Sequence, residues 1–283
     1  MQSSEDIACW SVPADNLRVR SNPWQQRAER AEQLASQIPP AAEVLRFFVP
    51  IVLFQETLYR WLTSASLPAA RLSFKEALEP ALTRQFRTLL AVAEGHGPDA
   101  IVNIARELQE GDDDSYSILL QTFWKGGNGA PAETGTQSFL ARAFLQPYAE
   151  FIRSKMETSS LPHAPCLCPL CNRKPGMGVL RPLGDGGQRF LLCSLCLHEW
   201  EFRRIVCPGC GEEDYAKLPV YRAEEFSYMR VECCDVCKTY IKTVDLTENG
   251  LAVPVVDEMA AISLDLWAQK QGYSKLQVNL MHF

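Results

Sequence analysis

The spacing of apolar residues changes near residue 160 of this 283-residue chain. Before that position, apolar side chains recur at helical spacing, stretches rich in Gly and Pro separate the segments, and no segment alternates as a strand does. The pattern therefore predicts an α-helical region over residues 1–160. Its helices are expected at residues 23–37, 41–64, 74–94, 98–109, 116–124 and 136–156.

The segment 41–64 is apolar on almost every side, which is typical of a helix buried inside a bundle. Pro50 within it, and Pro147 within the segment 136–156, are expected to kink their helices. Residues 1–22 are polar and lack a persistent period, so they predict a loose lead-in.

After a short linker at residues 159–165, the period of the apolar residues shortens towards two. Residues 179–183 and 189–193 flank a Gly-Asp-Gly-Gly turn signal, which predicts a β-hairpin. A second hairpin is expected around the acidic connection within residues 218–232. Two further strands should pair with these hairpins, at residues 199–206 and 239–245.

A last helix is predicted over residues 257–269, because its apolar residues share one face and Gly272 suits its end. The tail 273–283 is too apolar to extend freely into solvent, so we expect it to be docked against the rest of the protein. The predicted fold class is α plus small β, with an all-α region followed by two tandem cysteine-knuckle units. The expected parts are a helical domain (1–160), a first unit (161–200), a second unit (201–250) and a C-terminal helix with its tail (251–283).

Ten of the eleven cysteines lie between Cys166 and Cys237, and eight of them form four C-x-x-C pairs. Two such pairs supply the four ligands of a closed tetrahedral metal site. The gaps of 21 and 23 residues between pairs can each hold a hairpin, so we expect the first two pairs to share one ion and the last two another. A cross-braced arrangement, in which alternate pairs share an ion, stays open by the same ligand rules. The predicted ligands are Cys168, Cys171, Cys193, Cys196, Cys207, Cys210, Cys234 and Cys237.

The three remaining cysteines and two of the histidines are not predicted to be metal ligands. Cys166 and Cys233 adjoin the knuckles and are interpreted as spare thiols, with a redox or exchange role as the alternative. Cys9 is isolated and His96 is expected in an exposed loop. His198 follows the second knuckle directly, but four thiolates are already available there, so it is interpreted as a surface or neighbouring residue.

Composition and charge exclude several function classes. The longest apolar run, at 47–54, is far shorter than the ~20 residues of a membrane span, and the first ten residues do not resemble a signal peptide. We therefore expect a cytoplasmic protein and disfavour a disulfide scaffold, which would need an oxidising compartment. The chain carries a net charge of −6, and the cysteine region has eleven basic and eleven acidic residues before its thiolates are counted. A basic footprint for nucleic acid is missing, so that partner is disfavoured.

No phosphate loop, nucleophile elbow or H-E-x-x-H motif is present, and closed tetrathiolate sites leave no ligand position for a substrate. The sequence thus predicts a protein that presents a surface and is not an enzyme. It does not reveal the oligomeric state, and a homodimer is possible.

The sequence around the knuckles resembles the formate dehydrogenase accessory protein family of the E type (FdhE). The resemblance covers about residues 160–283. It is carried by the four pairs, by HEW after the second pair, by TYIK after the fourth and by LDLWA in the last helix. Asn172 and Lys238 depart from the glycine that commonly follows the second cysteine of a knuckle.

The resemblance implies a cytoplasmic, non-catalytic assembly factor that binds the catalytic subunit of a respiratory formate dehydrogenase before twin-arginine export. It also implies rubredoxin-like sites that hold iron, although zinc accepts the same four cysteines. A rubredoxin-like electron carrier to the same client is the alternative function, and a nucleic-acid-binding zinc ribbon is a weaker one.

Overall fold

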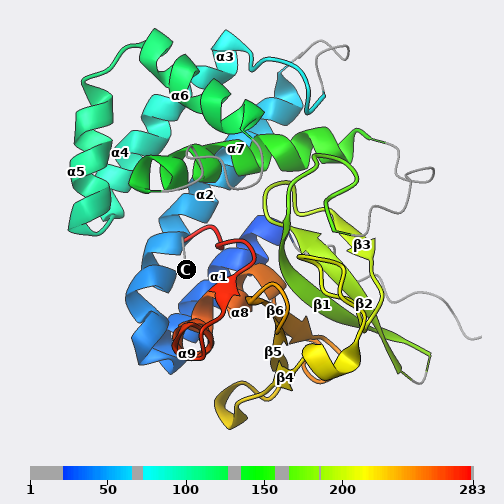
Figure 1. The fold of residues 1–283 in the computed structure, drawn as a ribbon. Coiled ribbons are helices and arrows are strands. Elements are labelled where there is room, and N and C mark those ends of the chain that lie inside the picture. Colours follow the sequence, from blue (N-terminus) through cyan, green and yellow to red (C-terminus); the bar gives the residue numbers. More distant parts are fainter. Residues whose placement is uncertain (1–21, 66–72, 127–134, 157–165, 185, 282–283) are drawn as a thin grey trace, which may run out of the picture.

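The computed structural model describes residues 22–65, 73–126, 135–156, 166–184 and 186–281. A helical N-terminal region is followed by a sheet region that carries the cysteines, and this confirms the predicted fold class (Figure 1). Cys9 and the linker at 159–165 lie outside the described residues. In the part of the chain that the structure describes, no helix has the length and apolar character needed to cross a membrane.

The helices follow the predicted order with one correction. The segment 74–94 was expected to be one helix, but its helical part begins only at Pro80 and restarts at Phe86. Pro80 favours a first helical position, where its missing N–H costs nothing, and it disfavours helix in the residue before it. The helices are α1 (Pro23–Gln37), α2 (Ala42–Ser64), α3 (Pro80–Thr83), α4 (Phe86–His96), α5 (Asp99–Gln109), α6 (Asp113–Lys125) and α7 (Thr136–Ser154).

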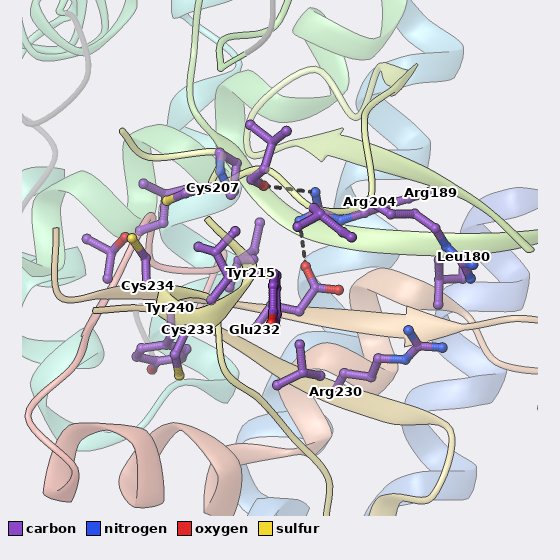
Figure 2. A pocket seen from close by; sticks show the side chains of 18 residues that line it. Leu180, Arg189, Arg204, Cys207, Tyr215, Arg230, Glu232, Cys233, Cys234 and Tyr240 are labelled. Carbon is purple, nitrogen blue, oxygen red and sulfur yellow. Dashed lines mark hydrogen bonds and ion pairs between the residues drawn. The ribbon is translucent and has the colours of Figure 1, made fainter. Parts of the chain in front are cut away.

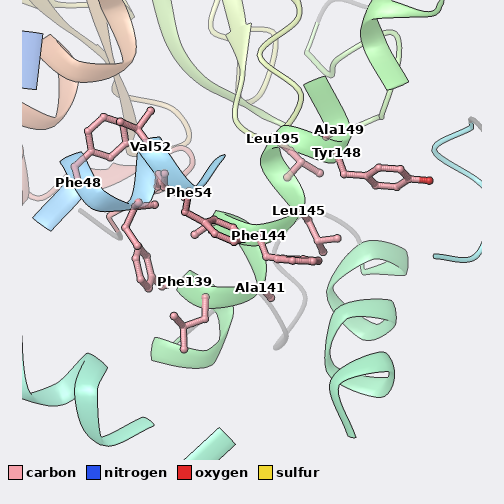
Figure 3. Close-up of a cluster of buried hydrophobic side chains, with 14 of the residues drawn as sticks. Phe48, Val52, Phe54, Phe139, Ala141, Phe144, Leu145, Tyr148, Ala149 and Leu195 are labelled. Carbon is pink, nitrogen blue, oxygen red and sulfur yellow. The ribbon is translucent and has the colours of Figure 1, made fainter. Parts of the chain in front are cut away.

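The core of the helical region lies where α2 crosses α7. Both helices continue through their internal prolines, Pro50 and Pro147. Every residue of α7 from Ser138 to Ile152 is buried, and its Phe144 stacks 6.2 Å from Phe54 of α2 (Figure 3). Burial on all sides makes α7 the central element, against which the other parts pack.

One sheet joins the two cysteine units. Its strand order is β3-β2-β1-β6-β5-β4, and the two halves meet where β1 pairs with β6 in parallel, through Gly178 opposite Thr243. A Cβ on Gly178 would lie 2.2 Å from the Thr243 hydroxyl, so glycine permits this close approach. The strands are β1 (Pro175–Leu183), β2 (Gly186–Cys193), β3 (Glu199–Glu201), β4 (Val220–Tyr221), β5 (Met229–Cys234) and β6 (Thr239–Asp245).

The strand predicted at 199–206 is shorter than expected, since β3 ends at Glu201. Beyond it the guanidinium of Arg189 donates to the carbonyls of Arg203 and Val206, at 2.9 and 3.3 Å. These carbonyls are therefore satisfied by a side chain instead of a neighbouring strand.

The last helix is also corrected, because the segment 257–269 forms parts of two helices, α8 (Pro254–Ala260) and α9 (Ile262–Lys270). At the break the buried ammonium of Lys242 donates to the carbonyls of Glu258 and Ala261, at 2.5 and 3.1 Å. Gly272 ends α9 with a φ of 83°, as expected.

The tail is docked, as predicted, over its described residues. The short strand β7 (Ser274–Lys275) pairs with β6, and Leu276 and Leu280 are buried. From α7, the guanidinium of Arg142 donates to the carbonyls of Val278 and Asn279, at 2.7 and 3.0 Å.

A buried charge network fastens α8 and α9 to the sheet. Lys242 lies 2.5 Å from Asp265 and 3.1 Å from Glu258, and Lys275 lies 2.5 Å from Glu258. Burial acts to raise the pKa of Glu258, but the two ammonium groups outweigh burial and lower this pKa to about 2. The carboxyl group of Glu258 is consequently ionised at neutral pH, and the side chains of all four members are buried.

We expect Lys242→Met to destabilise the protein by about 3–5 kcal/mol, because it leaves buried carboxylates short of a partner. Chemical denaturation of the metal-loaded protein measures the change. Lys238→Met is the matched control: Lys238 belongs to an exposed pair with Asp235, worth about 1 kcal/mol or less. Equal effects of the two substitutions would contradict this account of the network.

Candidate metal centres

All four C-x-x-C pairs adopt one turn conformation. The residue after the second cysteine has a positive φ in every case: 58° at Asn172, 52° at Leu197, 80° at Gly211 and 54° at Lys238. Asn172 and Lys238 therefore take the conformation for which glycine is usual, in agreement with the expectation that both can form the turn. The turn aims the two thiols of a pair towards the same point.

A backbone hydrogen bond closes the first three turns in the same way. The first cysteine donates its N–H to the carbonyl of the residue two places after the second cysteine, as from Cys168 to Arg173 at 2.8 Å and from Cys207 to Glu212 at 2.9 Å. The second pair repeats the bond, from Cys193 to His198 at 2.9 Å. This backbone role, and the stacking of its ring beside Trp200, are what the structure gives His198.

The sulfurs come together in two groups, in the sequential arrangement that the hairpins predicted and not the cross-braced one. The first group contains Cys168, Cys171, Cys193 and Cys196, and the second contains Cys207, Cys210, Cys234 and Cys237. Within each group all four sulfurs lie within 4.8 Å of one another. Among the described residues, these are the two clusters of His, Cys and carboxylate ligand atoms close enough to hold an ion.

The sulfur separations fit a tetrahedral ion. They are 3.3–3.6 Å between neighbours in the first group and 3.7 Å in the second. Four sulfurs about 2.3 Å from a central ion would be about 3.8 Å apart. A disulfide needs about 2.0 Å, and the ten cysteines in the described part of the chain are free. Each group could therefore hold one metal ion.

The first site is built into the helical region. Leu195, between the cysteines of the second knuckle, is 3% exposed and packs into the cluster formed by α2 and α7 (Figure 3). Arg173 donates to the carbonyl of Phe123 near the end of α6 at 2.6 Å, and Arg153 of α7 donates to the carbonyl of Leu197 at 3.0 Å. These contacts bury the first site between the sheet and the helices.

The second site lies nearer the surface. Cys210 is exposed, and Val236, which corresponds in position to Leu195, is 53% exposed. The Thr239 hydroxyl lies 3.0 Å from the sulfur of Cys237. Burial acts to raise the pKa of Cys237, but hydrogen bonds from Thr239 and the neighbouring thiols outweigh it and lower the pKa to about 7.

The two spare cysteines stay outside both sulfur groups. Cys233 is buried in an apolar cluster with Tyr240 and Tyr273, and burial raises the pKa of Cys233 to about 12. Such a thiol is protonated at neutral pH and unreactive. Burial also raises the pKa of Cys166, which is half-buried. His96 ends α4 instead of lying in a loop, and it is exposed as expected.

Family models match the whole cysteine region. The central domain of FdhE matches residues 167–204, and its C-terminal domain matches residues 205–282. The chain belongs to the FdhE family. An FdhE homolog from Aquifex aeolicus is 28% identical over 90% of this chain and 93% of its own, and one from Haemophilus influenzae is 26% identical over 95% and 91%.

The fold of this FdhE chain is also found in a solved structure. The crystal structure of the FdhE protein from Pseudomonas aeruginosa matches with a TM-score of 0.68 at 24% sequence identity. The match covers 92% of this chain and 95% of that one, so it includes the helical region as well as the cysteine region.

Sequence reasoning found the sulfur groups but missed the residues that attach the first one to the helices. Leu195 carried some signal, since it is a large apolar residue between the two cysteines of a knuckle. Arg173 and Arg153 carried none, because their partners are backbone carbonyls distant in sequence.

We expect Leu195→Ala to destabilise the FdhE chain by about 2–5 kcal/mol, because it leaves a cavity in the core around α7. Val236→Ala, at the corresponding exposed position, should change the stability by about 0.5 kcal/mol or less. Denaturation of the two metal-loaded variants makes the comparison. A large loss of stability in Val236→Ala would show that the two sites are equally embedded.

Metal removal should also distinguish the sites. We expect about two ions per loaded chain and a two-step release to a chromophoric chelator, with the ion of the exposed second site leaving first. Cys210→Ser should abolish the fast step and leave the slow one. Release of both ions in a single step from the parent protein would contradict the difference in burial.

Proposed function

We propose that this FdhE chain is a non-catalytic maturation factor that acts in the cytoplasm on the catalytic subunit of a respiratory formate dehydrogenase. The eight paired cysteines are its metal ligands, four to each ion. Iron is the favoured metal because the family resemblance implies it, and zinc suits the same sulfur set.

The observation that carries this proposal is the closure of both sulfur groups within a chain of the FdhE family. Four thiolates already complete a tetrahedral ion, so no position is left at which the ion could activate a substrate. What the metal supplies when bound is a rigid shape for the knuckles, since metal-binding free energy in such units is folding free energy. A shaped surface suits the binding of a protein client.

A second candidate function is electron transfer to the same client. The exposure of Cys210 favours it, because one ligand of the second site reaches the surface where a partner could approach. The two candidates share the client and differ in whether the ion must be redox-active.

Loss of the second site should abolish capture of the client. In Cys210→Ser with Cys237→Ser, two thiolates are too few for a stable tetrahedral site, so the metal content should fall from two ions to one. Capture of the purified catalytic subunit should fall at least tenfold. Cys166→Ser is the control, because Cys166 is outside both groups and its loss should change neither quantity. Undiminished capture by the double variant would show that the second site is not needed for recognition of the client.

Zinc substitution separates the two candidate functions. A zinc-loaded protein keeps the shape of the sites and lacks the redox step, so it should capture the client and restore formate dehydrogenase activity in cells if it is a maturation factor. Capture without restoration of that activity would instead favour the electron carrier.

A further inference from the structure

A cavity of about 260 Å³ lies on the sheet beside the second site (Figure 2). Cys207 and Cys234 stand at one end of it. On β5, Arg230 and Glu232 line the cavity, whereas Val231 between them packs into the apolar cluster with α9 on the opposite face. The cavity is therefore on the face of the sheet that the C-terminal helices leave uncovered.

The part of this cavity away from the cysteines is positively charged. It contains the guanidinium groups of Arg189, Arg204 and Arg230 and a single carboxylate, Glu232. Arg189 is buried and lies 2.5 Å from Glu232, and Arg230 lies 2.5 Å from Asp245, which is outside the lining. Arg204 is exposed and makes no hydrogen bond or ion pair to the residues that the structure describes.

This charge contrasts with the surroundings. Residues 201–250 contain seven basic and ten acidic side chains, so the unit as a whole is acidic. Arg204 and Arg230 of this acidic unit, together with Arg189 of β2, therefore make a local positive site around one carboxylate. Such a site favours an anionic ligand group, which an arginine can bind through two parallel hydrogen bonds.

The mouth of the cavity is apolar. Ile205, Tyr215 and Val220 all line it and are 57%, 77% and 54% exposed. Exposed apolar side chains gathered at one concave place mark an interaction surface. Val220 belongs to β4, the outermost strand of the sheet, so an extended chain can reach the cavity along this edge.

We propose that this cavity binds an extended segment of the client in which a carboxylate side chain is flanked by apolar ones. The carboxylate is received by Arg204 and Arg230, and the flanking side chains cover Ile205, Tyr215 and Val220. This inference rests on the proposed function, and it assigns the surface that recognises the client.

Capture of the purified formate dehydrogenase catalytic subunit by the full, metal-loaded chain tests the proposal. Arg204→Glu reverses the charge and Val220→Asp places a carboxylate at the mouth, and each should weaken capture at least tenfold. The matched controls are Arg203→Glu and Leu251→Asp. Arg203 pairs with Glu213 outside the cavity, and Leu251 is 85% exposed outside both the cavity and the knuckles, so both controls should capture normally.

A fluorescent anionic dye tests ligand binding in the cavity without the client. Anilinonaphthalenesulfonate joins an apolar body to one anionic group, so its fluorescence on binding should fall severalfold in Arg204→Glu and stay unchanged in Arg203→Glu. All variants should retain two ions per chain, which shows that the sites are intact.

The outcomes are distinguishable. If the parent chain does not capture the subunit, the proposed function fails and this inference fails with it. If the parent captures it and the two cavity variants capture it equally well, the inference alone is overturned. Probe binding that is insensitive to Arg204→Glu would also overturn it, because the cavity would then not select an anion.

Discussion

The geometry of the cysteine region depends on placing the four sulfurs of each group 3.3–3.7 Å apart, and this requires a left-handed residue after each knuckle. Three of the four residues that adopt this conformation carry a side chain: Asn172, Leu197 and Lys238. The conformation costs about 1–2 kcal/mol for a typical residue with a Cβ. A structural ion contributes about 10–16 kcal/mol in small thiolate units. The ion can therefore hold the three turns in a conformation that the chain alone disfavours.

The same turn conformation occurs in a buried first site and in a more exposed second site. In the first site the knuckle carries Leu195 into the helical core, and Arg173 and Arg153 add hydrogen bonds to backbone carbonyls. In the second site the corresponding residue is Val236, which faces solvent. Because a buried site cannot open without disturbing its neighbours, the first site is part of the core, and the second is free to take part in binding.

Local features were predictable from the sequence, and long-range ones were not. The Gly-rich turn at 184–187, the acidic connection within 218–232 and the spacing of the pairs predicted the hairpins and the sequential grouping of sulfurs, because 21 or 23 residues separate the two pairs of each group. The parallel pairing of β1 with β6 joins residues 65 positions apart, as between Gly178 and Thr243. The spacing of apolar residues along the sequence does not predict which strands pair over such a distance. The break between α8 and α9 at Ala261 was not predicted for a similar reason, since the carbonyls there accept hydrogen bonds from Lys242 of a distant strand.

On the proposed function, the cavity would connect the metal to the client without requiring an electron. Cys207 and Pro208 of the third knuckle, and Cys234 of the fourth, form one end of its lining. Because metal-binding free energy in such units is folding free energy, an ion in the second site would fix the conformation of these knuckles and with it the shape of the cavity. A chain that lacks the second ion would present a different surface to the client even if its helical region were intact. If the chain is a maturation factor, metal loading would in this way decide whether it is competent to bind its client.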